Sequence, residues 1–322
     1  MIIKSKMGCR PSEKMKTFEI KKRDWRAVVD LSNGASCTSL KNRKYGATIL
    51  REPPADKAAR GSLLYGMPIL FPVNRIEKGS FEFEGRQYVF PINEPKTDCH
   101  LHGELYKAEF ELIEASDSRL KCRYAASKDS PYLCFPHEFE IITEYELKDD
   151  GLYHKVTVRN LSGENMPVFL GFHTTFNSLF FKNSKPENIR VYAEISEEYA
   201  RNMTTNYLPS GEKPPFDSLS SSISKGDLNP FCEKFSRLYR GCGVMTVTDT
   251  ASGLRIVYEN DEKYKFRLIL CGGDDGYICL EPQTCLVNCQ NSPFSREEAG
   301  FDYLKPLERK IYRSKIFLDE TV

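Results

Sequence analysis

The chain has 322 residues, of which 40% are hydrophobic and 28% are charged, and its formal net charge is +1. This is the composition of an ordinary globular protein with enough apolar mass for a sizeable core. The charge balance gives no footprint for binding nucleic acid or an anionic membrane surface, and no apolar run approaches the roughly 20 residues of a membrane span.

The N-terminal stretch MIIKSKMGCRPSEKMKTFEIKKRDW is broken by charges and lacks the apolar core of a signal peptide. We therefore expect a cytoplasmic protein in which residues 1–16 form an N-terminal extension. The 11 cysteines contain no CxxC pair, which argues against a zinc cage or a thioredoxin-like motif. In a reducing compartment they are expected to be buried thiols.

Two stretches predict β-hairpins. Residues 80–90, SFEFEGRQYVF, alternate apolar and polar side chains around a turn at 84–86. Residues 137–160, HEFEIITEYELKDDGLYHKVTVRN, alternate on both sides of Asp150 and Gly151, a strong turn signal. Further strands, rich in Val, Ile, Tyr and Phe, are predicted at 119–126, 190–195, 245–249, 254–260, 265–271 and 310–318.

These strands follow one another without long amphipathic helices between them. Such an order favours an all-β antiparallel sandwich over a βαβ fold. Residues 197–240 break the pattern because they are rich in Pro, Gly and Ser. We interpret them as an irregular insertion over one face, with short helical turns. Without an internal repeat or a clean linker, the prediction is one domain over residues 1–322.

Polar residues with catalytic chemistry stand among apolar strand residues in four segments. If residues 99–103 are extended, His100 and His102 point to the same face and could bind a metal together with His173. A zinc site would also need a second shell around its ligands. The four segments are GMPILFPVNRI with Asn74 and Arg75, CHLHG with His100 and His102, MPVFLGFHTTFNSLF with His173, and DDGYICLEPQTC with Glu281.

Glu281 ends an apolar strand that Pro282 terminates. A carboxylate there is costly to bury unless it is paired or lies at a wet site. Its pKa is expected to rise towards the range of a general base, and an ion pair with an arginine is the alternative. Phe172 and Phe176 flank His173, which suits the apolar faces of a sugar ring as well as simple core packing.

Taken in order, PVNRIEKGSFEFEGRQYVFPINE, HLHG, MPVFLGFHTTFN and ICLEPQT resemble the aldose 1-epimerases, or galactose mutarotases. The resemblance runs from about Thr17 to the C-terminus. It implies the family fold, a large antiparallel β-supersandwich. It also implies that His102, which precedes the glycine, is the functional histidine of its pair, and that His100 is a neighbour.

The resemblance further implies an acid–base reaction on a hexopyranose. Glu281 would take the proton from the C1 hydroxyl, and His173, as imidazolium, would protonate the ring oxygen, which an unperturbed imidazole pKa of ~6.5 allows. His102 and Arg75 would hold sugar hydroxyls, with Asn74 assisting. The reaction needs no metal and no organic cofactor. The expected partner is a small sugar such as galactose or glucose, and the expected assembly is a monomer or homodimer.

The sequence departs from the family pattern at three places. Glu104 replaces the second glycine of the LHGG motif, and Thr175 stands where an aromatic residue is usual. The family's sugar-binding aspartate has no aligned counterpart, and Asp217 and Asp227 are the candidates.

Two alternative functions stay open at this point. A mutarotase of a phosphorylated or otherwise modified hexose would need an extra cation, which Lys213 or Arg201 could supply. A non-catalytic carbohydrate-binding protein on the same fold would not need both His173 and Glu281, because a binder requires no matched acid and base.

Overall fold

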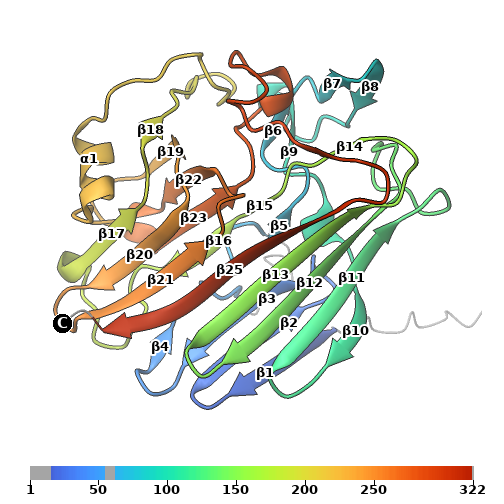
Figure 1. Cartoon of the computed structure of the whole chain (residues 1–322). Coiled ribbons are helices and arrows are strands. Elements are labelled where there is room, and N and C mark those ends of the chain that lie inside the picture. The colour runs from blue at the N-terminus through green and yellow to red at the C-terminus, as the bar shows by residue number, and fades with distance from the viewer. Residues whose placement is uncertain (1–15, 55–61, 321–322) are drawn as a thin grey trace, which may run out of the picture.

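The structure of this chain, a computed structural model, describes residues 16–54 and 62–320. The expected N-terminal extension over residues 1–16 lies outside the described residues except for Lys16. The all-β prediction is confirmed, since antiparallel sheets form the layers seen in Figure 1. Among the described residues, no helix combines the length and the apolar character needed to cross a membrane.

An eight-stranded antiparallel sheet forms the largest layer and contains the longer predicted hairpin. The hairpin arms pair from Phe139 with Asn160 to Lys148 with Gly151. The turn requires a glycine because φ of Gly151 is 156° and a Cβ there would overlap the carbonyl oxygen of Ile316. Across the sheet (Figure 1), the strands are β10 (Glu111–Ala115), β11 (Arg119–Ala126), β12 (Phe139–Lys148), β13 (Gly151–Asn160), β25 (Arg309–Glu320), β21 (Leu254–Asn260), β20 (Gly243–Asp249) and β17 (Ile189–Ala193).

A second, seven-stranded sheet carries the candidate site. One of its faces packs against the eight-stranded sheet, where the ring of Phe176 lies 5.6 Å from that of Tyr258 and Oγ1 of Thr174 lies 3.1 Å from the Tyr258 hydroxyl. Because side chains alternate along a strand, the residues between these point to the other face. The strand order is β18 (Glu197–Glu198), β19 (Phe235–Arg240), β22 (Phe266–Cys271), β23 (Tyr277–Gln283), β15 (Gly171–Phe172) and β5 (Ile69–Leu70), and β16 (Thr174–Asn177) also pairs with β23.

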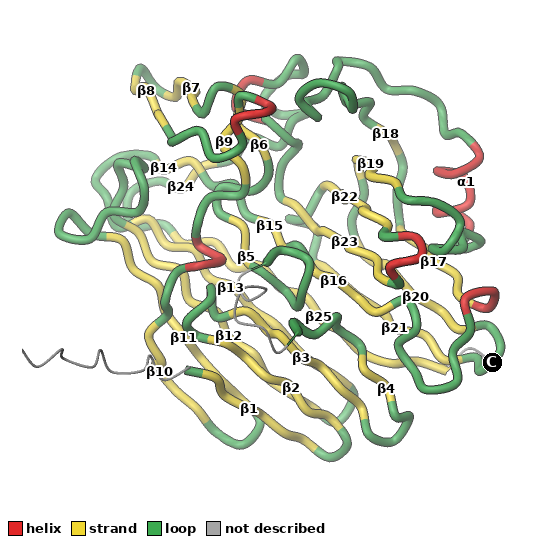
Figure 2. The backbone as a smooth tube through the Cα atoms, turned by 180° about the vertical axis from the view of Figure 1, so that it is seen from behind, coloured by secondary structure: helices red, strands yellow, loops and turns green. Residues whose placement is uncertain are grey.

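A four-stranded sheet at the N-terminal end completes the sandwich and is seen from behind in Figure 2. The hydroxyl of Tyr145 on β12 donates a hydrogen bond of 2.9 Å to the carbonyl oxygen of Ala35, which ties this sheet to the eight-stranded one. Its strands are β1 (Thr17–Lys22), β2 (Trp25–Asp30), β3 (Ser36–Asn42) and β4 (Ala47–Thr48).

Three two-stranded ladders cap one end of the sandwich, at the top of Figure 1. One of them is the hairpin predicted over residues 80–90, which is thereby confirmed. The ladders are β6 (Arg75–Glu77) with β9 (Cys99–Leu101), β7 (Ser80–Phe83) with β8 (Arg86–Val89), and β14 (Met166–Pro167) with β24 (Tyr303–Leu304). Short 3₁₀ helices span Pro95–Thr97, Leu105–Lys107, Pro186–Asn188, Gly273–Asp275 and Cys289–Asn291.

The prediction that residues 197–240 are irregular is correct only in part. β18 begins this segment, the helix α1 (Ser218–Lys225) lies within it, and β19 ends it. Asp217 caps α1 by accepting a hydrogen bond of 2.9 Å from the backbone N–H of Ser220, and Gly226 ends it in a left-handed conformation. The sequence pattern does not predict β19. Only two of its residues, the neighbours Leu238 and Tyr239, are buried, so its alternation of apolar and polar residues is weak.

Candidate active site

Glu281 and His173 face each other across two neighbouring strands. β23 carries Glu281, and His173 links β15 to β16. Thr174 pairs with Leu280 in the antiparallel register, so the next pair outward sets His173 opposite Glu281. Nε2 of His173 lies 3.2 Å from Oε1 of Glu281. The structure therefore brings together the two residues expected to act as acid and base.

Burial controls the protonation of this pair. Glu281 is 1% exposed and His173 is 6% exposed, and burial penalises the charged form of each. It raises the pKa of Glu281 to about 8 and lowers the pKa of His173 to about 4. The positive charges of Arg201 and Arg75 and a hydrogen bond from Gln283 oppose the rise in the Glu281 pKa. At pH 7 the free protein thus holds a protonated carboxyl beside a neutral imidazole.

Burial therefore favours the state of the pair in which the carboxyl is protonated and the imidazole is neutral. Burial disfavours the imidazolium form of His173, which is the form expected to act as the acid. Among the described residues, neither Oε1 of Glu281 nor Nδ1 of His173 has an aligned hydrogen-bond partner. Buried polar atoms are normally satisfied, so both atoms fit a polar ligand.

His100 and His102 do not share a face, contrary to the expectation for an extended segment. β9 ends before His102, whose φ is 63°. Nδ1 of His102 accepts a hydrogen bond of 3.2 Å from the backbone N–H of Asn74, and its ring centroid lies 5.9 Å from that of His173. Nδ1 of His100 lies instead 2.7 Å from the carbonyl oxygen of Pro91. His102 joins the site, and the three-histidine metal cluster is not assembled.

His102 is held as a neutral hydrogen-bond donor. Burial lowers its pKa well below the usual range, and the neighbouring His173 and Arg75 lower it further. Because Nδ1 accepts the bond from Asn74, the single ring proton of the neutral form is on Nε2.

Arg75 is oriented by two contacts. Its Nε and Nη2 donate to the two carboxylate oxygens of Glu94 at 2.6 and 2.7 Å, and its guanidinium carbon lies 4.7 Å from the ring centroid of Tyr207. Bidentate pairing and stacking together hold the planar group in one position. Among the described residues, no acceptor binds its Nη1, which is therefore available to a ligand.

Sequence reasoning missed two residues that support the site, Glu94 and Gln283. Nε2 of Gln283 donates to Oε2 of Glu281 at 3.3 Å, and its Oε1 accepts from Nδ2 of Asn74 at 3.5 Å. The expectation that Pro282 ends the strand is wrong, because β23 continues through Pro282 to Gln283, which therefore lies on the same face as Glu281. Glu94 could not be assigned in this way, because it lies in the loop before β9.

Of the residues singled out between 197 and 240, Arg201 acts on the site, since its charge lowers the pKa of Glu281. Lys213 forms ion pairs with two glutamates, so it is not a free cation. Asp217 caps α1 and pairs with an arginine at 2.9 Å, and Asp227 is exposed just after this helix.

Among the described residues, one group of donor atoms could hold a metal ion. A nitrogen of His173, the sulfur of Cys279 and a carboxylate oxygen of Glu281 lie within 4.8 Å of one another. Burial raises the pKa of the Cys279 thiol well above its usual range, and the nearby Glu281 adds to this. Cys279 is therefore held as the thiol, which is a poor ligand until a metal displaces its proton.

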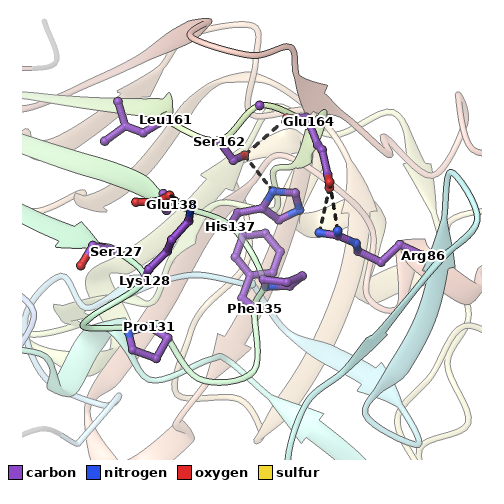
Figure 3. A pocket seen from close by; sticks show the side chains of 12 residues that line it. Arg86, Ser127, Lys128, Pro131, Phe135, His137, Glu138, Leu161, Ser162 and Glu164 are labelled. Atoms are coloured by element: carbon purple, nitrogen blue, oxygen red, sulfur yellow. Dashed lines mark hydrogen bonds and ion pairs between the residues drawn. The ribbon is translucent and has the colours of Figure 1, made fainter.

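A cavity of about 510 Å³, which neither Glu281 nor His173 lines, involves a different histidine, His137 (Figure 3). The ring nitrogens of His137 lie 2.8 Å from the Tyr88 hydroxyl and 3.0 Å from Oγ of Ser162. At its rim Arg86 pairs with Glu164 at 2.8 Å. Because the polar groups of His137 are satisfied by protein partners, it does not offer the open acid–base pair found at Glu281 and His173.

Known proteins share both the sequence pattern and the fold. A sequence profile of the aldose 1-epimerase family matches residues 16–300. A galactose mutarotase-like protein from Clostridium acetobutylicum is 28% identical, with 96% of each chain covered and a TM-score of 0.91. A galactose 1-epimerase from Lactobacillus acidophilus is 11% identical, with 96% of this chain and 100% of that chain covered and a TM-score of 0.68, which shows the shared fold.

The match covers most of the chain and includes all the residues expected at the site, and it agrees with the observed antiparallel sandwich. The chain belongs to the aldose 1-epimerase family.

Proposed function

We propose that the protein is an aldose 1-epimerase that interconverts the α and β anomers of a free aldohexose such as galactose or glucose. The observation that carries this proposal is the buried pair of Glu281 and His173, whose facing atoms lie 3.2 Å apart. Anomer interconversion needs one group that removes a proton from the C1 hydroxyl and one that protonates the ring oxygen.

Ring opening uses the pair in its ionised form. Glu281, as carboxylate, takes the proton of the C1 hydroxyl while the bond between C1 and the ring oxygen breaks, and His173, as imidazolium, protonates that oxygen. The products are an open-chain aldehyde, a protonated Glu281 and a neutral His173. After rotation about the C1–C2 bond, both proton transfers reverse and the ring closes on the other face of C1.

The resting pair therefore matches the open-chain stage of the cycle. Opening a ring requires the proton to pass first from Glu281 to His173. The positive charges of Arg201 and Arg75 lower the pKa of Glu281, which favours this transfer. The attraction between the resulting charges at 3.2 Å favours it as well.

The sugar is held by donors that surround this pair. The Nε2–H of neutral His102 and the Nη1 of Arg75 are available for hydroxyl groups and for developing negative charge on oxygen. Both polar atoms of the Asn74 side chain are engaged, with the Arg75 backbone at 3.0 Å and with Gln283 at 3.5 Å. Asn74 therefore positions these neighbours, and its assistance to the sugar is indirect.

The competing function is a carbohydrate-binding protein without activity. A binder gains nothing from a carboxyl and an imidazole whose pKa values are shifted in opposite directions by burial, so this pairing favours an enzyme. No metal or organic cofactor takes part in the proposed steps. A single domain, a cytoplasmic location and assembly as a monomer or homodimer stay predictions.

Polarimetry tests the proposal. Freshly dissolved α-D-galactose and α-D-glucose should reach their equilibrium rotation faster with catalytic amounts of the protein than in buffer alone. Unchanged rates with both sugars, for protein whose fold is verified by circular dichroism, would refute it for free aldohexoses.

A further inference from the structure

Arg201 enters the site from the loop between β18 and α1. Its Nη2 donates hydrogen bonds of 2.8 and 2.7 Å to the carbonyl oxygen and to Oγ of Ser236 on β19. Both acceptors are neutral. The guanidinium is therefore anchored in position, and its charge is left uncompensated by these contacts.

Neighbouring cations differ from Arg201 because each forms an ion pair with a carboxylate. Arg75 is paired with a glutamate at 2.6 Å, and Arg237 is paired with Glu198 at 2.5 Å and with an aspartate at 2.9 Å. Lys213 and Arg240 also form ion pairs. Within residues 16–54 and 62–320, no carboxylate forms an ion pair with Arg201.

The electrostatic surroundings of Arg201 destabilise the positive charge of its guanidinium. Burial lowers the pKa of Arg201 to about 10, and the positive charge of Arg75 adds to the effect, whereas Glu281 opposes it. The contact of Glu281 within 4 Å is with His173, at 3.2 Å, and not with the guanidinium of Arg201. A half-buried cation without a carboxylate partner favours the binding of an anion.

The register of the sheet sets the distance between Ser236, which anchors Arg201, and the strand that carries Glu281. Ser236 pairs with Leu270 on β22, and Leu270 pairs with Cys279 on β23, two residues before Glu281. Side chains two residues apart share a face, so the anchor of Arg201 lies on the same face as Glu281. Adjacent strands are about 4.8 Å apart, which puts this anchor roughly 10 Å from the strand that holds the base. A pyranose with an exocyclic substituent bridges such a separation.

Space for a substituent exists beside Arg201. A cavity of about 350 Å³ is lined by Arg201, Ser236, Met203 and Phe235, among others. Glu198 also lines it, and its charge raises the pKa of Arg201, but its carboxylate forms an ion pair with Arg237 and accepts a hydrogen bond of 2.6 Å from a serine hydroxyl.

We propose that Arg201 and this cavity form a subsite for an oxyanion, either a phosphate or a carboxylate, on the end of the sugar remote from C1. A guanidinium matches both groups because it donates parallel hydrogen bonds to two oxygens. The inference rests on the proposed function and deepens it. Neutral hexoses react at the pair of Glu281 and His173, and an anionic hexose is bound more tightly in the same position.

The test compares kcat/KM for glucose, glucose 6-phosphate and glucuronate in the wild type, Arg201→Met and Arg201→Lys. The wild type should prefer one of the anionic sugars over glucose by about tenfold or more, as charge-assisted hydrogen bonds provide. The preference for that sugar identifies phosphate or carboxylate as the ligand. Arg201→Met should abolish the preference, and Arg201→Lys should restore it in part. Because Arg201 also lowers the pKa of Glu281, the rate with glucose should fall as well in Arg201→Met, so the readout is the ratio of kcat/KM between the anionic sugar and glucose.

Lys213→Met is the matched control, since this cation belongs to the same segment and is already paired. It should leave the preference unchanged. Calorimetric titration with glucose 6-phosphate and glucuronate measures binding without turnover. If both bind no better than glucose, and equally to the wild type and Arg201→Met, the subsite does not exist. If binding of an anionic sugar depends on Arg201 but no sugar changes its anomeric rate, the subsite stands and the proposed enzymatic function falls.

Discussion

Asn74 and His102 bind each other reciprocally. The backbone N–H of Asn74 donates to Nδ1 of His102 at 3.2 Å, and the backbone N–H of His102 donates to the carbonyl oxygen of Asn74 at 2.9 Å. Both residues are left-handed, with φ values of 62° and 63°. This strained arrangement turns the imidazole out of β9 and towards His173, which is how one histidine of the CHLHG segment reaches the site and the other does not.

The two histidines of this segment should respond differently to truncation. His102→Ala removes a donor aimed at the sugar and should lower kcat/KM by about tenfold to a hundredfold, in line with the loss of an oriented donor. His100→Ala should stay within a few-fold of the wild type. Polarimetry on both variants measures this. Equal losses in the two variants would show that His102 has no special place in the site.

The pH dependence of kcat/KM should form a bell between about 4 and about 8. Below the pKa near 4 the pair gains a second proton and lacks a base, and above the pKa near 8 it loses its shared proton and lacks an acid. The two limbs of the bell reflect apparent pKa values of the interacting pair, so neither limb is assigned to Glu281 or His173 alone. Unperturbed groups would place the limbs near 4.3 and 6.5 instead. A basic limb close to 6.5 would show that burial does not shift the pair.

Glu94 should be needed to orient Arg75. Glu94→Gln removes the charge that holds the guanidinium bidentately and should lower kcat/KM about tenfold, mainly through KM. Glu140→Gln is the matched control, because Glu140 also pairs with arginines and is similarly shielded, but on β12. If both variants lose activity to the same extent, the effect is not specific to Arg75.

Gly103, directly after His102, should be intolerant of a side chain. Its φ is 62°, and a Cβ there would overlap the carbonyl oxygen of Phe71. Gly103→Ala should lower the free energy of unfolding by about 3 kcal/mol or more. Gly85→Ala has a similar positive φ but open space around its Cβ, so it should cost about 1–2 kcal/mol. Urea unfolding of both variants measures how much of the loss in unfolding free energy comes from steric overlap and how much from backbone strain. Equal losses in the two variants would show that the overlap at Gly103 costs nothing beyond the strain of a positive φ.

The sandwich was predictable because alternation is a local signal. The hairpins at 80–90 and 137–160 follow directly from the spacing of apolar residues and from their turn residues. The short strand β19 was not predictable in this way, since only two of its residues are buried. Its pairing with β22 depends on the neighbouring strand, which is distant in sequence.

The site was predictable to the extent that its residues stand in recognisable segments. Resemblance to the family selected Glu281, His173 and His102, but it carried no information on their charge states. Those depend on burial, which tertiary packing creates. The left-handed turn of His102 and the unpaired charge of Arg201 likewise depend on contacts between segments far apart in the chain.

The most direct test of the central claim is polarimetry of α-D-galactose and α-D-glucose with the wild type beside Glu281→Gln and His173→Asn. Both variants should keep the fold and much of the sugar affinity, and each should lower the rate by ~10² or more, as expected for the loss of a general base or acid. Sugar binding measured by calorimetry separates lost chemistry from lost affinity. Wild-type acceleration by Glu281→Gln would contradict the assignment of Glu281 as the base that opens the ring.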